Sequence, residues 1–323
     1  MVDERRASAL LRLAGSTGIA ERQLALPIER VIADRGFGAR NREFLEHAAA
    51  LAARAGRTAL DRARLDGSRV DLIITTSCTG VAIPSLAGLL VPRLGLRTDV
   101  VRLPITELGC AAGAAALARA REHLLAFPDH VALVISVELT SLTFQRGDAS
   151  MSNLVASSIF GDGAAAVVLG GPPVAPSPRI LDARTHLWPG SAHLMGFDVE
   201  DSGFRIVLDR AVPAFLEGKV RPLVAALCEA NGVAPEQLSF AALHPGGRRI
   251  LDNLERELGL GPEVTDESRA VLREHGNMSS ATVLFVLERL LRRRPSPAPG
   301  SLGLLAAFGP GFSAELALLR WEA

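Results

Sequence analysis

The chain has 323 residues, 48% of them apolar, and its 35 basic residues balance 35 acidic ones. This length accommodates two domain-sized halves around a large core, and the neutral balance excludes a global field that would attract nucleic acid or an anionic membrane. The charged residues 1–12 lack the apolar core of a signal peptide, and Pro92 and Gly309-Pro310-Gly311 interrupt the longest apolar runs, 86–96 and 302–319. We therefore predict a cytoplasmic protein without membrane or nucleic-acid partners.

Helical and apolar patterns alternate along the chain. Ala, Leu and Arg recur at helical spacing over 42–63 and 111–125, and a third helical pattern covers 279–293. Between these patterns, uninterrupted apolar runs at 71–76, 131–136 and 302–308 are typical of strands that are buried on both faces. The alternation predicts an α/β fold with mostly parallel sheets.

A proline-rich segment at 170–178 divides the chain nearly in half, because closely spaced prolines sustain neither a helix nor a central strand. We predict two domains, residues 1–170 and 179–323. A glycine turn followed by an apolar strand pattern closes each half, at 161–169 and at 309–318. This recurrence indicates a duplicated architecture.

Three cysteines, an odd number without metal-ligand spacing, argue against a disulfide framework. Cys110 follows an extended segment and precedes a run of small residues, which places its thiol at a strand-to-helix turn. A helix dipole and a nearby imidazolium would lower its pKa and favour a nucleophilic thiolate. The alternative is that Cys110 is a small buried hydrophobic residue, as most free cysteines are.

Two further glycine-flanked motifs supply polar side chains. His244 ends an apolar run and precedes Pro245-Gly246-Gly247, where the glycines let a ligand approach the backbone. Asn277 follows Gly276 and leads into a helical pattern. Histidine and asparagine can both donate hydrogen bonds to an oxygen that gains charge during acyl transfer. The structural alternatives are a plain turn at the histidine and a helix N-cap at the asparagine.

Together the three motifs, with Phe160-Gly161-Asp162-Gly163 and Phe308-Gly309-Pro310-Gly311, resemble the type III polyketide synthases, the chalcone synthase group. The resemblance extends from about residue 10 to residue 320. It implies a thiolase-like fold, with duplicated βαβαβ halves in five αβαβα layers. It also implies a homodimer, and it predicts that the N-terminal strand of the family's core sheet is missing here.

The resemblance implies that Cys110 takes a starter acyl group from coenzyme A (CoA). His244 and Asn277 would decarboxylate malonyl-CoA and stabilise the enolate for Claisen condensation, without a metal or redox cofactor. The implied substrate-cavity residues are Cys78, Ile83, Glu138, Thr140, Thr143, Ala156, Phe160, Met195, Phe197, Ile206 and Ser279. The implied CoA-binding residues are Arg12, Gly246, Gly247 and Arg248, although Ala9 and Ser16 stand where plant enzymes carry lysines.

Cavity residues suggest the product class. Met195, Phe197 and the small Ala156 favour a fatty acyl starter and an alkylpyrone or alkylresorcinol product, whereas Cys78 also matches tetrahydroxynaphthalene synthases. The resemblance further predicts a cis Ile83-Pro84 loop that reaches into the partner's cavity. Three other functions remain open: a β-ketoacyl carrier-protein synthase III, a thiolase or thioester hydrolase, and a catalytically disabled thiolase-like scaffold.

Overall fold

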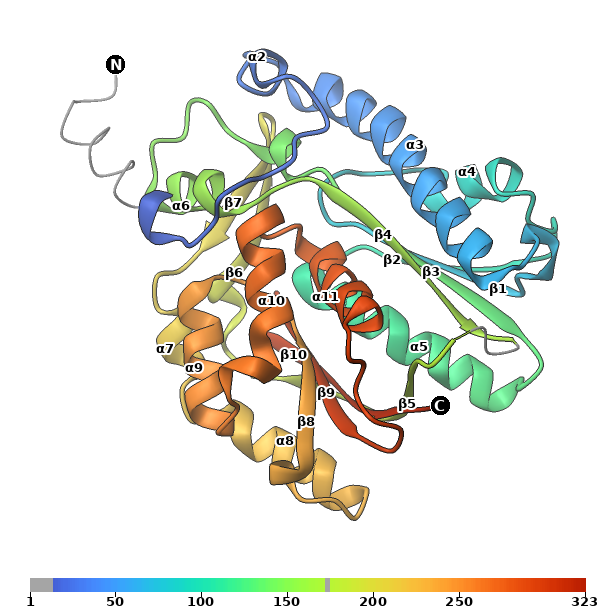
Figure 1. The fold of residues 1–323 in the computed structure, drawn as a ribbon. Coiled ribbons are helices and arrows are strands. Elements are labelled where there is room, and N and C mark those ends of the chain that lie inside the picture. The colour runs from blue at the N-terminus through green and yellow to red at the C-terminus, as the bar shows by residue number, and fades with distance from the viewer. Residues whose placement is uncertain (1–13, 172–174) are drawn as a thin grey trace.

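The computed structural model describes residues 14–171 and 175–323, which form two four-stranded sheets, a two-stranded hairpin and the surrounding helices (Figure 1). The first sheet has the order β2 (Val101–Ile105), β1 (Leu72–Thr76), β3 (Val131–Glu138), β4 (Gly163–Gly170). The second has the order β5 (Pro178–Leu187), β10 (Ser313–Trp321), β9 (Leu302–Gly309), β8 (Leu238–Leu243), and the hairpin pairs β6 (Met195–Glu200) with β7 (Gly203–Leu208).

The helices are α2 (Ile28–Val31), α3 (Phe37–Ala63), α4 (Leu86–Arg93), α5 (Ala112–Ala126), α6 (Met151–Ile159), α7 (Val212–Leu216), α8 (Val220–Ala230), α9 (Arg248–Leu258), α10 (Pro262–His275) and α11 (Thr282–Arg292). Short 3₁₀ turns precede two of them, η2 (Gly109–Ala111) before α5 and η6 (Ser279–Ala281) before α11. The helical patterns at 42–63, 111–125 and 279–293 therefore correspond to α3, α5 and α11.

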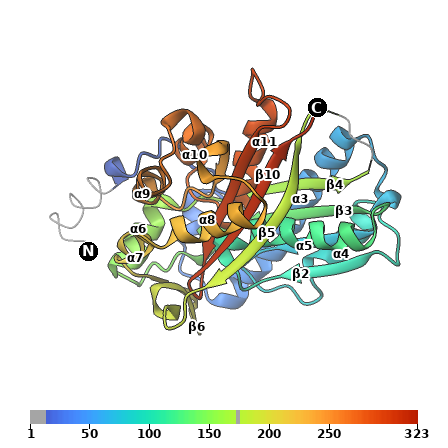
Figure 2. The ribbon, with the colours of Figure 1, turned by 90° about the horizontal axis from the view of Figure 1, so that it is seen from below.

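Five layers follow from three apolar clusters (Figures 1 and 2). Helices α3 and α4 cover one face of the first sheet, α5 and α11 lie between the two sheets, and α8, α9 and α10 cover the far face of the second. On β1, Ile73 faces the outer cluster while Ile74 faces the central one, and both are fully buried. The uninterrupted apolar runs of the central strands follow from this coverage of both faces.

The two sheets are mixed, so the prediction of mostly parallel sheets was wrong. Strand β1 runs parallel to β2 and β3, and β8 runs parallel to β9, but β3–β4, β9–β10 and β10–β5 are antiparallel. After the turn at 309–311 the chain forms β10, which runs back along β9, whereas the longer connection that contains α6 returns the chain from β3 to β4 in the opposite direction.

The two halves repeat one arrangement, with β3–β4 corresponding to β9–β10. The correspondence ends at one edge. Strand β10 also pairs with β5, whereas in the described part of the chain β4 has no partner on its second edge and lines a groove between α3 and α11. No helix within residues 14–171 or 175–323 is long and apolar enough to cross a membrane.

Candidate active site

Cys110 lies where β2 has ended and η2 leads into α5, at the predicted strand-to-helix turn. Gly109 takes a left-handed φ of 48°, and a Cβ there would lie 2.7 Å from Cδ of Pro310, so glycine is required at this bend. A Cβ on Gly113 would lie 2.2 Å from the carbonyl oxygen of Ser280. The first turn of α5 therefore packs against η6 at backbone distance, and this contact joins the first half of the chain to the second.

This packing brings Cys110 to Asn277. The Cys110 Sγ lies 3.9 Å from Asn277 Oδ1 and 3.6 Å from Ser279 Oγ. Ser279 has a left-handed φ of 48°, which is uncommon for a residue with a side chain and clusters at functional sites. Two of the three motifs thus meet at one thiol.

Hydrogen bonds fix both the backbone and the side chain of Asn277. The backbone N–H donates to the Ile159 carbonyl (2.8 Å), and the backbone carbonyl accepts from the Gly161 N–H (3.0 Å). Asn277 Oδ1 accepts from the Ser279 N–H at 2.8 Å, which is the turn-capping role considered as the alternative, while Nδ2 donates to the Gly246 carbonyl at 3.4 Å. The donor side of the amide therefore faces the histidine motif.

His244 directly follows β8 and is held by its backbone N–H, which donates to the Ala306 carbonyl at 2.8 Å. The residue is 1% exposed, yet neither ring nitrogen has a hydrogen-bond partner among the described residues. A Cβ on Gly246 would lie 3.7 Å from His244 Nε2, so the glycine limits crowding beside the ring. Buried polar atoms are normally paired, and an unpaired imidazole is therefore available to a bound ligand.

Burial sets the protonation of both reactive groups. It raises the pKa of the Cys110 thiol from 9.0 to about 11 and lowers the pKa of the His244 imidazole to about 4. Both groups are therefore neutral near pH 7. The predicted lowering of the thiol pKa was wrong, because loss of water outweighs hydrogen bonds to the sulfur and the imidazole carries no charge.

A buried carboxyl group, that of Glu138, organises the hydrogen bonds beside Cys110. Glu138 Oε2 accepts from the Cys78 N–H (3.1 Å), Thr79 Oγ1 (2.8 Å) and Ser77 Oγ (3.2 Å), and Oε1 accepts from Ser280 Oγ (2.6 Å). Burial raises the pKa of this carboxyl and raises the pKa of the Cys78 thiol well above its usual value. The sequence did not identify Ser77, Thr79 and Ser280 as site residues. The only signal for them was a run of hydroxyl side chains after β1 and a second serine after Asn277.

Ser279 connects the predicted cavity residue Cys78 to the nucleophile. The Cys78 Sγ lies 3.5 Å from Ser279 Oγ, the same atom that contacts Cys110 Sγ. The structure therefore brings together Cys78, Cys110, Glu138 and Ser279, as the resemblance implied.

Most other predicted cavity residues belong to a short 3₁₀ turn, to α6 and to the β6–β7 hairpin. Thr140 Oγ1 donates to the Gly161 carbonyl and Thr143 Oγ1 donates to the Thr140 carbonyl, both at 2.8 Å. Phe160 forms an isolated β-bridge with Asn277. Ala156 is buried in α6, and Met195, Phe197 and Ile206 belong to the β6–β7 hairpin, in which Phe197 pairs with Ile206. Ile83 is 90% exposed, and the peptide bond before Pro84 is cis, as predicted.

Three of the four predicted CoA-binding residues, Gly246, Gly247 and Arg248, are consecutive at the start of α9. Arg12 lies outside the described residues. Arg248 starts α9, is exposed, and lies beside Gly18, with its Nε 4.0 Å from Asp252 Oδ2. Gly246 and Gly247 are half-buried next to His244.

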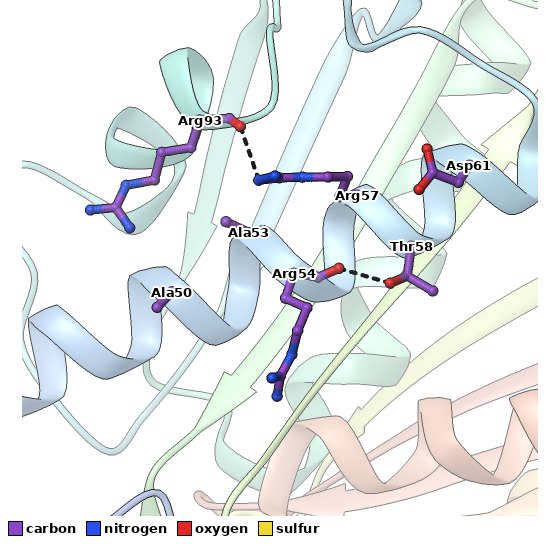
Figure 3. A pocket seen from close by; sticks show the side chains of 7 residues that line it. All are labelled: Ala50, Ala53, Arg54, Arg57, Thr58, Asp61 and Arg93. Carbon is purple, nitrogen blue, oxygen red and sulfur yellow. Dashed lines mark hydrogen bonds between the residues drawn. The ribbon is translucent and has the colours of Figure 1, made fainter.

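A separate surface hollow lies over α3 (Figure 3) and contains none of the predicted site residues. Its lining residues are Ala50, Ala53, Arg54, Arg57, Thr58, Asp61 and Arg93. Within the described ranges, no group of three or more His, Cys, Asp or Glu side chains is placed to hold a metal ion. The structure places the Cys110 thiol beside the Asn277 amide, whose donor side faces the glycine turn that follows His244. A cysteine can act as a nucleophile, and histidine and asparagine side chains can bind a developing oxyanion.

Comparison with known proteins agrees with this geometry. The chain matches the family models for chalcone and stilbene synthases, with the N-terminal domain at residues 32–173 and the C-terminal domain at 179–321. A 1,3,6,8-tetrahydroxynaphthalene synthase from Streptomyces peucetius subsp. caesius is 44% identical over 320 residues, which cover 97% of this chain and 83% of the relative. A phloroglucinol synthase from Pseudomonas fluorescens is 36% identical over 325 residues, covering 99% and 91%.

A solved structure extends the comparison to three dimensions. The crystal structure of 1,3,6,8-tetrahydroxynaphthalene synthase from Streptomyces coelicolor A3(2), described as a bacterial type III polyketide synthase, matches with a TM-score of 0.92. The two chains are 37% identical, and the match covers 98% of this chain and 90% of that one. The fold is therefore that of a thiolase-like condensing enzyme.

The chain belongs to the chalcone and stilbene synthase family, the type III polyketide synthases. It is accordingly an acyltransferase that uses CoA thioesters. This membership excludes two of the functions left open by the sequence, a β-ketoacyl carrier-protein synthase III and a thiolase or thioester hydrolase.

Proposed function

We propose that this polyketide synthase uses malonyl-CoA both to start and to extend its chain, and closes the product to a polyhydroxylated aromatic of the tetrahydroxynaphthalene type. The observation that carries the proposal is the position of Cys78, whose thiol shares the Ser279 hydroxyl with Cys110 beside the buried Glu138. Relatives named for tetrahydroxynaphthalene and phloroglucinol, both aromatic polyols, support it. No metal or redox cofactor takes part in the proposed reaction.

In the first step, the neutral His244 imidazole accepts the Cys110 proton as sulfur attacks the thioester carbonyl. The bond to the CoA sulfur breaks, the imidazolium gives its proton to the departing CoA thiolate, and an acyl-Cys110 thioester forms. A neutral base suits this step because the His244 pKa of about 4 keeps the ring unprotonated near neutral pH.

In the second step, bound malonyl-CoA loses its carboxylate as CO₂, and the resulting enolate oxygen accepts hydrogen bonds from His244 and Asn277. Asn277 Nδ2 has two hydrogens, and its donation to the Gly246 carbonyl at 3.4 Å uses one of them. Preorganised donors in a water-poor site stabilise such charge strongly. The enolate carbon then attacks the acyl carbonyl, and the Cys110 thiolate leaves.

Two structural features support a homodimer. Ile83 is 90% exposed next to the cis Pro84, and Val81 is 44% exposed in the same loop. Exposed apolar side chains on an ordered loop suit a protein partner, and we propose that a second copy of the chain covers them. Sedimentation of the wild type against Ile83→Asp tests this proposal, since the charged side chain would produce monomers.

The second candidate product is an alkylpyrone or alkylresorcinol made from a fatty acyl starter. The buried Ala156 and the aliphatic Ile206, which pairs with Phe197, favour it because small and aliphatic walls suit an alkyl chain. The CoA phosphates would lie near Arg248, beside Gly246 and Gly247, in either case.

Product mass spectrometry distinguishes the candidates. The wild type is incubated with malonyl-CoA alone and with acyl-CoA starters of graded length, beside Cys110→Ala and a Cys228→Ala control that removes a buried thiol of another layer. We expect a tetrahydroxynaphthalene mass from malonyl-CoA alone, lost only in Cys110→Ala. Faster formation of alkylated products would overturn the malonyl starter, and absence of every product would identify a disabled scaffold.

A further inference from the structure

We propose that Arg22 is a positioning residue for the decarboxylation step, because it holds the loop that fixes the backbone of Asn277. This inference rests on the proposed function of Asn277. Arg22 Nη1 donates to the carbonyl of Ser157 at 2.5 Å and to the carbonyl of Phe160 at 2.9 Å. Both acceptors belong to the C-terminal end of α6 and the residue that follows it.

The need for Arg22 follows from the way α6 ends. The Gly161 N–H would extend the helix by donating to the Ser157 carbonyl, but it donates to the Asn277 carbonyl instead, at 3.0 Å. The Ser157 carbonyl therefore loses its helical donor. The Arg22 guanidinium supplies the replacement, so that the Asn277 bond and the end of the helix are satisfied together.

The stem of Arg22 also packs on this junction. A Cβ on Gly161 would lie 3.4 Å from Cβ of Arg22, and a Cβ on Gly276 would lie 2.9 Å from Cγ of Arg22. Gly161 follows Phe160 and Gly276 precedes Asn277, so both glycines adjoin the isolated bridge between Phe160 and Asn277. The aliphatic stem thus packs beside the bridge, while the guanidinium donates to the Phe160 carbonyl of the bridge and to the Ser157 carbonyl of α6.

Neighbouring bonds hold Arg22 in place. The Ala20 N–H donates to the Arg273 carbonyl at 2.7 Å, and the Gln23 carbonyl accepts from the Asp162 N–H at 2.9 Å. The Ala25 N–H donates to Asp162 Oδ2 at 2.8 Å. The segment is therefore fixed on both sides of Arg22, and the junction can transmit its geometry to Asn277.

The role proposed for Arg22 predicts different effects on two half-reactions, the acylation of Cys110 and the decarboxylation of malonyl-CoA. Acylation of Cys110 uses the thiol and the imidazole, whereas decarboxylation also uses the Asn277 amide. Arg22→Met keeps the stem but removes both donors. We expect CO₂ release from malonyl-CoA to fall about tenfold or more, since a misplacement of about 1 Å can cost that much, with acylation of Cys110 changed by less than about twofold.

The test measures both rates in the wild type, Arg22→Met, Arg22→Lys, Asn277→Ala and the double variant of Arg22→Met with Asn277→Ala. The control is Arg121→Met, which also removes an arginine that donates to two backbone carbonyls, those of Ile180 and Leu181. We expect Arg22→Lys to recover part of the activity. The double variant should lose no more activity than Asn277→Ala, because the arginine acts through the asparagine.

Equal losses in both half-reactions, or additive losses in the double variant, would overturn the role of Arg22. If Arg22→Met does not fold, the same cycle is run with Arg22→Lys. If the wild type releases no CO₂, the proposed function fails by itself. In that case the pH profile of Cys110 alkylation tests the role of Arg22. The profile of Arg22→Met must shift as the profile of Asn277→Ala does, and an unchanged profile overturns the assignment.

Discussion

The resting state of Cys110 makes a sharp prediction about reactivity. Burial raises its pKa from 9.0 to about 11, so the thiolate fraction near neutral pH is about a hundredfold smaller than for an exposed thiol, equivalent to ~2.7 kcal/mol. Because only the thiolate reacts with iodoacetamide, Cys110 should be alkylated slowly. The rate should rise about tenfold per pH unit from about pH 7 to pH 10 without reaching a plateau.

Peptide mass spectrometry after timed alkylation measures this rate separately for Cys110, Cys78 and Cys228. His244→Ala is the informative variant. The neutral imidazole contributes no charge to the resting thiol, so the substitution should change the alkylation rate by less than about threefold. A plateau with an apparent pKa below about 7, lost in His244→Ala, would refute the neutral pair and establish a thiolate–imidazolium pair instead.

Other substitutions test the packing of the site. Glu138→Ala leaves three buried hydroxyl donors and the partly buried Cys78 N–H without their acceptor and should cost roughly 4 kcal/mol of unfolding free energy, measured by chemical denaturation. Gly113→Ala places a Cβ 2.2 Å from the Ser280 carbonyl and should lower both Tm and product formation, whereas Gly147→Ala, with open space around it, should change neither. Because folding lowers the pKa of His244 from 6.5 to about 4, the unfolded chain binds a proton between these pH values and the folded chain does not. Folding stability should therefore fall by about 3 kcal/mol as pH drops from 6.5 to 4, and the His244→Gln variant should lose that much less.

Local pattern was sufficient for much of the fold. The apolar run at 131–136 became β3, buried along its whole length, and the helical pattern at 42–63 became most of α3. Strand direction was not readable, because it depends on how the long connection that contains α6 returns the chain from β3 to β4. Sheet partners are chosen by tertiary contacts that a short window of sequence does not contain.

In the candidate site, too, some residues were readable from local sequence and others depended on tertiary contacts. Cys110 and Asn277 were identified from glycine-flanked motifs, and the structure places Cys110 Sγ 3.9 Å from Asn277 Oδ1 across 167 residues of sequence. Arg22 and Ser280 escaped notice because their roles arise from hydrogen bonds to segments more than a hundred residues away. The pKa of Cys110 was misjudged for a related reason: burial depends on the whole fold, whereas the helix dipole is visible locally.

The most direct test of the condensing site is the mass of the peptide that carries Cys110 during turnover. Wild-type enzyme is mixed with malonyl-CoA, quenched at short times and digested, in parallel with Asn277→Ala. Each condensation leaves the extended chain on CoA, from which it must be transferred back to Cys110 before the next extension. We therefore predict a ladder of acyl masses on Cys110 that grows by two-carbon units in the wild type and stops at the loaded starter in Asn277→Ala. An unmodified Cys110 while product accumulates would contradict the assignment of this thiol as the nucleophile.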